Sequence, residues 1–252
     1  MKNIRIVAII PTFNRKESLR EVLKSLALQR MEEKYCVETV VVVDGSSDGT
    51  MEMLLKEFPM IHIVNGDGSW WYTKCINAGL SKAKELDATF VLTLNDDVIF
   101  DSDYVANFIK YSSLGKDILI GSASFTQDKP HRITFSGIKR LVKWRLKEIS
   151  YIPKFSTVNV DLLKGIQPSV NLSGRGLFFN LSVTDKIGIY DENLKQYSSD
   201  TDFSYRAYKD GMDVFVTYDS KIFENEKLTS KGALYNQVSF REYFRSLFNE
   251  YS

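Results

Sequence analysis

The chain of 252 residues is poor in several features that mark particular classes of protein. It has two cysteines, Cys36 and Cys75, which lie far apart and have no metal-ligand spacing. A disulfide between them is one interpretation, but two unpatterned cysteines are more typical of reduced thiols in a cytoplasm. The two histidines, His62 and His131, are interpreted as structural or surface residues, so we do not expect a histidine-centred mechanism.

An excess of charge of either sign is also missing. The 33 lysines and arginines balance 32 aspartates and glutamates, which gives no overall attraction to nucleic acid. No stretch approaches the ~20 apolar residues that a membrane-spanning helix needs. The apolar run at residues 4–10 contains Arg5 and stops at Pro11 without a small-residue cleavage site, so it predicts a strand rather than a signal peptide. These absences predict a soluble, cytoplasmic protein that binds no nucleic acid.

Hydrophobic residues make up 44% of the chain, enough for a substantial core. In the first half, apolar runs predict buried strands at residues 4–10, 39–44, 61–64 and 89–94. Helices are predicted between them from apolar stripes at Leu19, Val22, Leu23 and Leu26, at Met51, Leu54, Leu55 and Phe58, and over residues 73–86. This alternation predicts a parallel sheet with helices on both faces.

The second half is less regular. Strands are predicted at "ILIGSAS", "ITFSGI", "GLFFN" and "MDVFVTY", a short helix ended by Gly211 at "DTDFSYRAYKDG", and either a helix or a ribbon at "KRLVKWRLK". No internal repeat, low-complexity tract or linker divides the chain. We therefore predict a single domain over residues 1–252, with a nucleotide-binding half at about residues 1–100, an acceptor half at about 101–230 and a C-terminal helix at 231–252.

Polar clusters follow the predicted strands of the first half. They read "TFN", "DGSSDG", "NGDGSWW" and "NDD". Sheets of this class bind ligands at the carboxyl ends of their strands. The four clusters therefore predict one ligand-binding edge.

Asp96 and Asp97 are adjacent carboxylates at the end of a buried run, where like charges repel unless a positive group lies beside them. They fit an exposed turn or a helix cap. They also fit a site for Mg²⁺ or Mn²⁺, which take carboxylate oxygens from a protein and diphosphate oxygens from a substrate. Their place at the ligand edge favours the metal site.

Asp44 ends the second predicted strand and suits hydrogen bonding to a ribose or a base. It comes too early to cap the next helix, a role that suits Asp48. The tryptophan pair at residues 70–71 fits either the core or the wall of a sugar or base pocket. Asp67 and Trp71 are further candidates at this edge for binding a nucleotide sugar. Lys74 and Arg15 are candidates for contacts with its diphosphate.

Seven stretches occur in a characteristic order: "VAIIPTFNR", "VVVVDGSSDGT", "INAGL", "LTLNDDV", "NLSGRGLFF", "IGIYDENL" and "DTDFSYRA". This order resembles that of family 2 glycosyltransferases over about residues 4–230. The resemblance implies an α/β GT-A fold, in which a Rossmann-like, mostly parallel central sheet flanked by helices binds a nucleoside diphosphate sugar and merges with a smaller mixed acceptor-binding region. It also implies a metal-dependent, inverting hexosyl- or deoxyhexosyltransferase.

For the donor, the resemblance implies that Pro11, Thr12 and Asn14 line the nucleoside pocket and that Asp44 recognises the base or ribose. The stretch "GDGSWW" resembles rhamnosyltransferase-like members of the family. A deoxyhexose donor is therefore an expectation from this stretch alone.

"NDD" corresponds to the D-x-D motif of the family, with Asn95 in place of the first acid. The correspondence implies that Asp97 is the principal metal ligand and that Asp96 contacts the ribose or sugar. "GRG", with Gly174 and Arg175, would approach the sugar.

The family places its catalytic base in a Glu-Asp pair, which here reads Ser199-Asp200 and is followed by Asp202. Asp200 would take the proton of the acceptor hydroxyl, and Asp202 would orient the site; the alternative is that both acids only cap a helix. Ser199 removes one acidic acceptor contact. The late histidine that often ligates the metal is missing, and Glu224 or Asn225 would replace it.

The tail at residues 238–251 carries an apolar stripe of Phe240, Tyr243, Phe244, Leu247 and Phe248. Packing against the domain or in a homodimer is the favoured interpretation. The alternative is an interfacial helix that places the protein at the inner face of the membrane, near a lipid-linked acceptor.

The sequence thus predicts a transferase that uses Mn²⁺ or Mg²⁺ to move a sugar from a nucleoside diphosphate to a saccharide or lipid-linked acceptor, in the synthesis of a surface polysaccharide. A non-catalytic relative that binds sugar nucleotides as an assembly or regulatory module competes with it. A nucleotidyltransferase ranks last, because "PTFNRKES" is not a glycine-rich basic loop.

Overall fold

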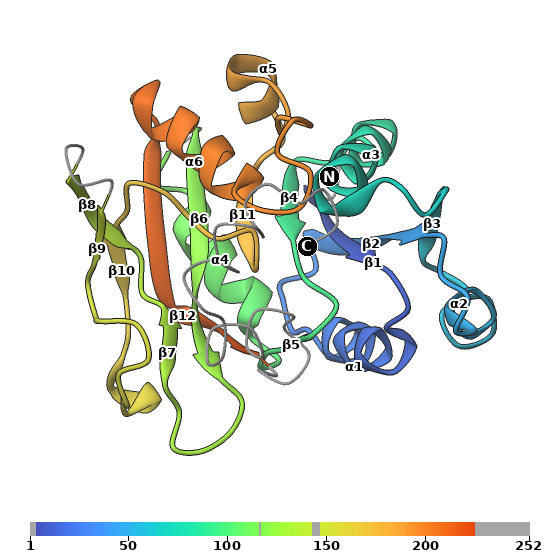
Figure 1. Ribbon diagram of the computed structural model, residues 1–252, viewed down its shortest axis with the longest axis horizontal. Coiled ribbons are helices and arrows are strands. Elements are labelled where there is room, and N and C mark those ends of the chain that lie inside the picture. Colours follow the sequence, from blue (N-terminus) through green and yellow to red (C-terminus); the bar gives the residue numbers. More distant parts are fainter. Residues whose placement is uncertain (1–3, 116, 143–146, 225–252) are drawn as a thin grey trace, which may run out of the picture.

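The computed structural model describes residues 4–115, 117–142 and 147–224 (Figure 1). Its helices are α1 (Lys16–Ala27), α2 (Thr50–Glu57), α3 (Trp71–Glu85), α4 (Tyr104–Ser112), α5 (Val183–Ile187) and α6 (Ser199–Lys209), with a 3₁₀ turn at Val160–Leu162. Its strands are β1 (Ile4–Thr12), β2 (Tyr35–Asp44), β3 (His62–Gly66), β4 (Phe90–Thr93), β5 (Val98–Ile99), β6 (Ile118–Thr126), β7 (Ile133–Phe135), β8 (Ile138–Val142), β9 (Lys147–Ser150), β10 (Ile166–Pro168), β11 (Leu177–Asn180) and β12 (Asp213–Glu224).

One sheet connects both halves of the described chain, in the order β10-β12-β6-β11-β4-β1-β2-β3. The four strands from the first half are parallel to one another. β11 runs antiparallel between β4 and β6, whereas β12 is parallel to β6. The predicted α/β class with a mostly parallel central sheet is confirmed, and the mixed part of the sheet belongs to the second half.

Helices cover both faces of this sheet, because its central strands are apolar on both sides. In β1, Val7 and Ile9 face a layer that includes α3, α5 and α6, and Ile6, Ala8 and Ile10 face a layer that includes α1, α2 and α4 (Figure 1). Burying one such aliphatic side chain contributes about 1.5–3 kcal/mol. The two layers hold the strand ends, and hence the ligand edge, in place.

The predicted elements differ from the structure at two helices. In α2, the predicted stripe is wrong at Leu55, which is 65% exposed, whereas Leu54 is buried and Met51 and Phe58 pack against the same core, with Phe58 one residue beyond the helix. The short helix buries Met53 and Leu54 against the sheet, and Leu55 lies on its exposed side. α3 begins at Trp71, two residues before its predicted start.

The basic stretch "KRLVKWRLK" contributes to a ribbon rather than a helix where it is described: β8 and β9 form a separate antiparallel pair. The predicted C-terminal helix at 231–252 and Asn225 lie outside the described residues. Among the helices that are described, none has the length and apolarity to cross a bilayer.

Candidate active site

The register of the parallel strands brings the polar clusters to one edge, as predicted. Thr12 at the end of β1 pairs with Val43, and Asp44 pairs with Gly66 of β3. On the other side of β1, Ile9 pairs with Thr93 at the end of β4. The loops that follow these strands therefore start from neighbouring points.

Asp44 fastens the loop between β3 and α3. The residue is 6% exposed; its Oδ1 accepts the Gly68 N–H (2.8 Å), and its Oδ2 accepts the N–H groups of Trp70 and Trp71 (3.0 Å each). Asp44 thus caps the start of α3, not of the helix that follows it in sequence. At Gly45, a Cβ would lie 2.7 Å from Gly68 Cα, so the two loops touch backbone to backbone.

Backbone strain gathers at this edge. Trp71 has φ +58 and is 39% exposed, and Asn14 and Ser198 also have left-handed backbone at φ +52 and +69. For a bulky residue such as Trp71 this conformation is an outlier that costs on the order of 1–3 kcal/mol and persists only where surrounding contacts hold it. Strain of this kind is common at ligand sites.

The loops after β1 and β2 are tied to each other. Asn14 donates its N–H to Ser46 Oγ (3.0 Å) and accepts the Ser47 N–H (2.7 Å). Asp48 accepts the N–H groups of Lys16 (2.8 Å) and Thr50 (3.1 Å), the first residues of α1 and α2, so its predicted cap role is confirmed. Burial by itself raises the pKa of Asp48, but hydrogen bonds from Thr50 and Lys16 outweigh burial and lower it.

Arg15 is the positive group beside the adjacent aspartates. Its Nη1 lies 3.2 Å from Asp96 Oδ1 and 2.8 Å from Asp97 Oδ2, and Thr12 Oγ1 donates to Asp96 Oδ2 (2.8 Å). The two carboxylate side chains are 8% and 7% exposed. Burial raises the pKa of Asp96 to about 6, with the Arg15 charge opposing the shift and the Asp97 charge adding to it.

A third carboxylate reaches the same edge from the second half. Glu224 ends β12 and pairs with Val98 of β5, the residue after Asp97. It is 5% exposed, forms an ion pair with Arg175 and accepts the hydroxyl of Thr134.

The described residues contain no ready-made group of three metal-binding side chains. Divalent cations of this class are commonly held by one or two carboxylates together with substrate phosphates. The carboxylate oxygens of Asp97 and Asp96 are of the type that a Mn²⁺ or Mg²⁺ ion takes when it arrives with a diphosphate.

Asp200 lies at the start of α6, where both of its oxygens meet backbone. Oδ2 accepts the Gly174 N–H (2.5 Å) and Oδ1 accepts the Thr201 N–H (2.9 Å). The Gly174 carbonyl accepts from Thr93 Oγ1 (2.7 Å) at the end of β4. One chain of contacts therefore joins the predicted base, the "GRG" segment and the strand that leads to Asp96.

The remaining predicted residues make other contacts. Asp202 accepts from Arg206 Nε (2.8 Å) on the same helix, and Arg206 in turn donates to Ile189 O. Asp67 is exposed, and hydrogen bonds from Ser69 lower its pKa. Lys74 lies over the Trp70 ring at 4.8 Å, and Pro11 stays in β1.

One residue of this edge was missed by the sequence interpretation. Tyr72 follows the tryptophan pair, and its hydroxyl is buried beside Gly174. Its place in "GDGSWWYTK" was the available indication.

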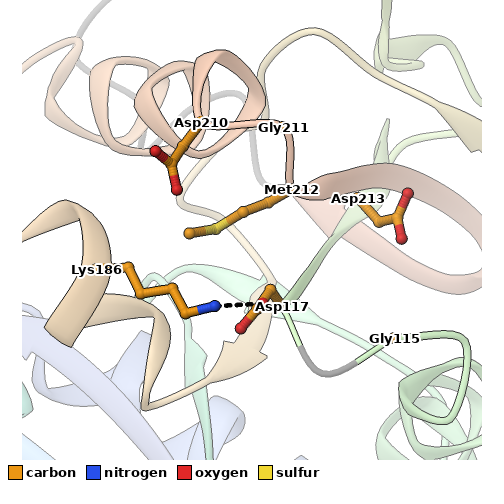
Figure 2. A pocket seen from close by; sticks show the side chains of 7 residues that line it. All are labelled: Gly115, Asp117, Lys186, Asp210, Gly211, Met212 and Asp213. Atoms are coloured by element: carbon orange, nitrogen blue, oxygen red, sulfur yellow. Dashed lines mark hydrogen bonds and ion pairs between the residues drawn. The ribbon is translucent and has the colours of Figure 1, made fainter.

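The opposite edge of the sheet also carries aspartates (Figure 2). A pocket of about 230 Å³ lies at the amino ends of β6 and β12, lined by Gly115, Asp117, Lys186, Asp210, Gly211, Met212 and Asp213. Lys186 Nζ pairs with Asp117 Oδ2 at 2.5 Å, with side chains 50% and 33% exposed. None of these residues is among the candidate site residues predicted from the sequence.

Comparison with known proteins places this architecture among sugar-transferring enzymes. A family model described as "Glycosyl transferase family 2" matches residues 7–166. The uncharacterised protein MJ0544 of Methanocaldococcus jannaschii is 35% identical over 102 residues, which cover 39% of this chain and 40% of that protein.

Solved structures share the fold at low identity. Residues 1–349 of S. aureus TarS superpose with a TM-score of 0.61 at 18% identity, covering 88% of this chain and 60% of that one. The same fragment in complex with UDP-GlcNAc gives 0.62 at 18% identity, with 96% and 64% covered. GalNAc-T7 with UDP, GalNAc and Mn²⁺ gives 0.66 at 13% identity, with 88% and 44% covered. The chain thus spans less than two thirds of the length of each of these proteins.

Proposed function

Because this chain belongs to glycosyl transferase family 2, we propose that it moves a sugar from a nucleoside diphosphate to an acceptor hydroxyl, with inversion at the anomeric carbon and Asp200 as the base. The observation that carries the proposal is the contact chain from Asp200 through Gly174 to Thr93, which links a held carboxylate to the strand end that bears Asp96 and Asp97.

In the proposed step, the oxygen of the acceptor hydroxyl forms a bond to the anomeric carbon. The bond from that carbon to the diphosphate oxygen breaks, and the nucleoside diphosphate leaves with the electron pair. Asp200 takes the acceptor proton. Since the nucleophile enters opposite the leaving group, configuration at the anomeric carbon inverts.

The donor would lie along the edge formed by Thr12, Asn14 and the loop that Asp44 fastens. Asp97, with Asp96 and Glu224 nearby, would hold a Mn²⁺ or Mg²⁺ ion, which neutralises charge on the departing diphosphate. Arg15 and Arg175, which form ion pairs with Asp97 and Glu224, would add positive charge beside the diphosphate.

The first test is thermal denaturation with nucleoside diphosphates and their sugars, each with and without Mn²⁺. UDP and UDP-GlcNAc come first because TarS has been crystallised with both. A ligand that binds only the folded protein raises Tm by mass action, so one base should stabilise the protein more with Mn²⁺. A folded protein that responds to no nucleotide contradicts the proposal.

The competing function is donor binding without transfer. Ser199, in place of the family glutamate, is fully buried and hydrogen-bonds with Thr73 Oγ1 (2.8 Å), so this position offers no acidic contact to an acceptor. Donor binding with neither hydrolysis nor transfer across many acceptors would favour it. The deoxyhexose donor, the polysaccharide product, the homodimer and the cytoplasmic location remain predictions.

A further inference from the structure

The Tyr72 hydroxyl is a buried polar group that the proposed mechanism leaves unused. In the described part of the chain it has no hydrogen-bond partner, and the same holds for the hydroxyl of Tyr190. Burying a hydroxyl without a partner is unfavourable, and a native protein that retains one calls for an explanation such as a catalytic role. Tyr72 lies at the start of α3, next to the strained Trp71.

The hydroxyl lies against Gly174 and Asp200. A Cβ at Gly174 would overlap the Tyr72 hydroxyl oxygen and would lie 3.2 Å from Asp200 Oδ2. Gly174 also donates its N–H to that same oxygen. The place that a Gly174 Cβ would take therefore lies between the Tyr72 hydroxyl and the Asp200 carboxylate. Only glycine at this position leaves room for both groups.

The two helices that carry Tyr72 and Asp200 are fastened at their first turns. Tyr72 N–H donates to Gln196 Oε1 (3.1 Å) in the segment before α6. The next residue, Thr73, donates its N–H to Lys195 O (3.0 Å) and hydrogen-bonds through Oγ1 with Ser199 Oγ (2.8 Å). These bonds fasten the first turn of α3, which carries Tyr72, to the first turn of α6, which carries Asp200.

The surrounding groups leave Tyr72 as a donor that needs an acceptor. Burial, and then Tyr190 and Asp200, raise the pKa of Tyr72 well above its ordinary value, with Arg175 opposing. The phenol therefore keeps its proton at neutral pH. The nearby Thr93 hydroxyl donates its own hydrogen to Gly174 O.

The same surroundings act on the second hydroxyl. Burial and Asp200 raise the pKa of Tyr190, with Arg206 opposing. Both phenols therefore keep their protons at neutral pH.

We propose that Tyr72 is a positioning residue for Asp200, whose carboxylate accepts a hydrogen bond from the Tyr72 hydroxyl when an acceptor is bound. Held by both Gly174 and Tyr72, Oδ2 is oriented, and Oδ1 is the oxygen that takes the proton of the acceptor. This inference rests on the proposed function and adds a residue to it.

The test replaces Tyr72 with phenylalanine and compares it with Tyr218→Phe. Tyr218 is 5% exposed and its hydroxyl donates to Ser136 O (2.8 Å), so the control loses a satisfied buried hydrogen bond away from Asp200. Tyr72→Phe should melt at or above the wild-type temperature, since it removes an unpaired hydroxyl. Tyr218→Phe should melt at a lower temperature.

The effects on kcat should be the reverse of those on Tm, with the larger loss in Tyr72→Phe. Tyr72→Phe should lower kcat about tenfold to a hundredfold, the effect of losing a hydrogen bond to a charged group, with KM for the acceptor near wild type. The acidic limb of its kcat–pH profile should move up by about one pH unit, because the ionised carboxylate loses a donor. Tyr218→Phe should retain the wild-type kcat and profile.

A double variant tests the proximity by itself. Gly174→Ala should lower Tm in the wild-type background and lower it less in Tyr72→Phe, because the overlap is with the hydroxyl oxygen. Equal losses in the two backgrounds contradict the geometry.

The possible outcomes distinguish a failure of this inference from a failure of the proposed function. If the wild-type protein transfers sugar and Tyr72→Phe has the same kcat and pH profile, this inference alone is overturned. A loss of kcat accompanied by a loss of Tm as large as that of Tyr218→Phe also overturns it. A wild-type protein that binds nucleotide but transfers no sugar overturns the proposed function, and the inference with it.

Discussion

The two edges of the central sheet both carry several aspartates, but they hold them in different ways. At the carboxyl edge, the Asp96 and Asp97 side chains are 8% and 7% exposed and share the guanidinium of Arg15. At the amino edge, the Asp117 side chain is 33% exposed and pairs with Lys186, itself 50% exposed. Exposed ion pairs contribute little to stability, whereas buried carboxylates persist only when other groups compensate them.

The difference favours the acidic residues of the carboxyl edge as the candidate site. At the carboxyl edge, Asp44, Asp48 and Asp200 accept backbone N–H groups from segments that strand order brings together. Their loops are strained at Asn14 and Trp71. The amino edge has a measurable pocket, yet its lining aspartates Asp210 and Asp213 are exposed. Burial and partners, rather than a hollow, distinguish the candidate site.

The largest expected effect is on transfer by Asp200→Asn. The amide keeps the size of the side chain but cannot take a proton, so kcat should fall about 10²- to 10⁴-fold. Nucleotide binding, measured by the rise in Tm, should be retained. The control is Asp210→Asn, which lies at the amino edge, just beyond the other end of the helix that carries Asp200. It should keep the wild-type kcat. Retained turnover in Asp200→Asn would remove its role as base.

The next effect concerns the cation. Asp97→Ala should abolish the additional stabilisation that Mn²⁺ gives to the nucleotide complex, with affinity in Mn²⁺ reduced about 100-fold. The measurement is nucleotide titration by calorimetry with Mn²⁺ and with a chelator. Asp117→Ala at the amino edge should titrate as wild type. If both variants keep the Mn²⁺ effect, the cation does not bind at Asp97.

Asp44→Ala tests the fastening of the donor loop. Three N–H groups lose their acceptor at once, so the free energy of unfolding should fall by about 2–3 kcal/mol. Urea denaturation measures it, and Asp213→Ala, exposed at the amino edge, should change it by less than about 0.5 kcal/mol. Equal losses of unfolding free energy in the two variants would contradict the difference between the two edges.

The smallest effect is a pH dependence at Asp48. Its pKa is lowered in the folded protein by hydrogen bonds that outweigh burial, so its stabilising contribution is present above the ordinary aspartate pKa of about 3.9 and is lost as pH falls through the lower folded value. Asp48→Ala should lower the free energy of unfolding by about 1 kcal/mol at pH 7 and by less near pH 3. Urea denaturation at the two pH values would show it, and a pH-independent difference would contradict it.

The predicted elements were right where local pattern decides structure. The β-branched run of β1 and the stripe at Leu19, Val22 and Leu23 were predicted because strand and helix periodicities are local properties of a sequence. The shared edge was predicted because parallel strands end on the same side. The prediction failed at Leu55, since periodicity alone does not tell which side of a short edge helix meets the sheet.

The order of strands and helices, the polar clusters that follow them and the candidacy of Asp200 could all be derived from the sequence. Which side chains meet could be learned from the folded chain alone: Arg15 meets Asp96 and Asp97, Asp44 meets the start of α3, and Tyr72 meets Gly174. These partners lie far apart in the chain. Their distances depend on the placement of β4 and β2 on either side of β1 and on the direction of each side chain, which no local pattern encodes.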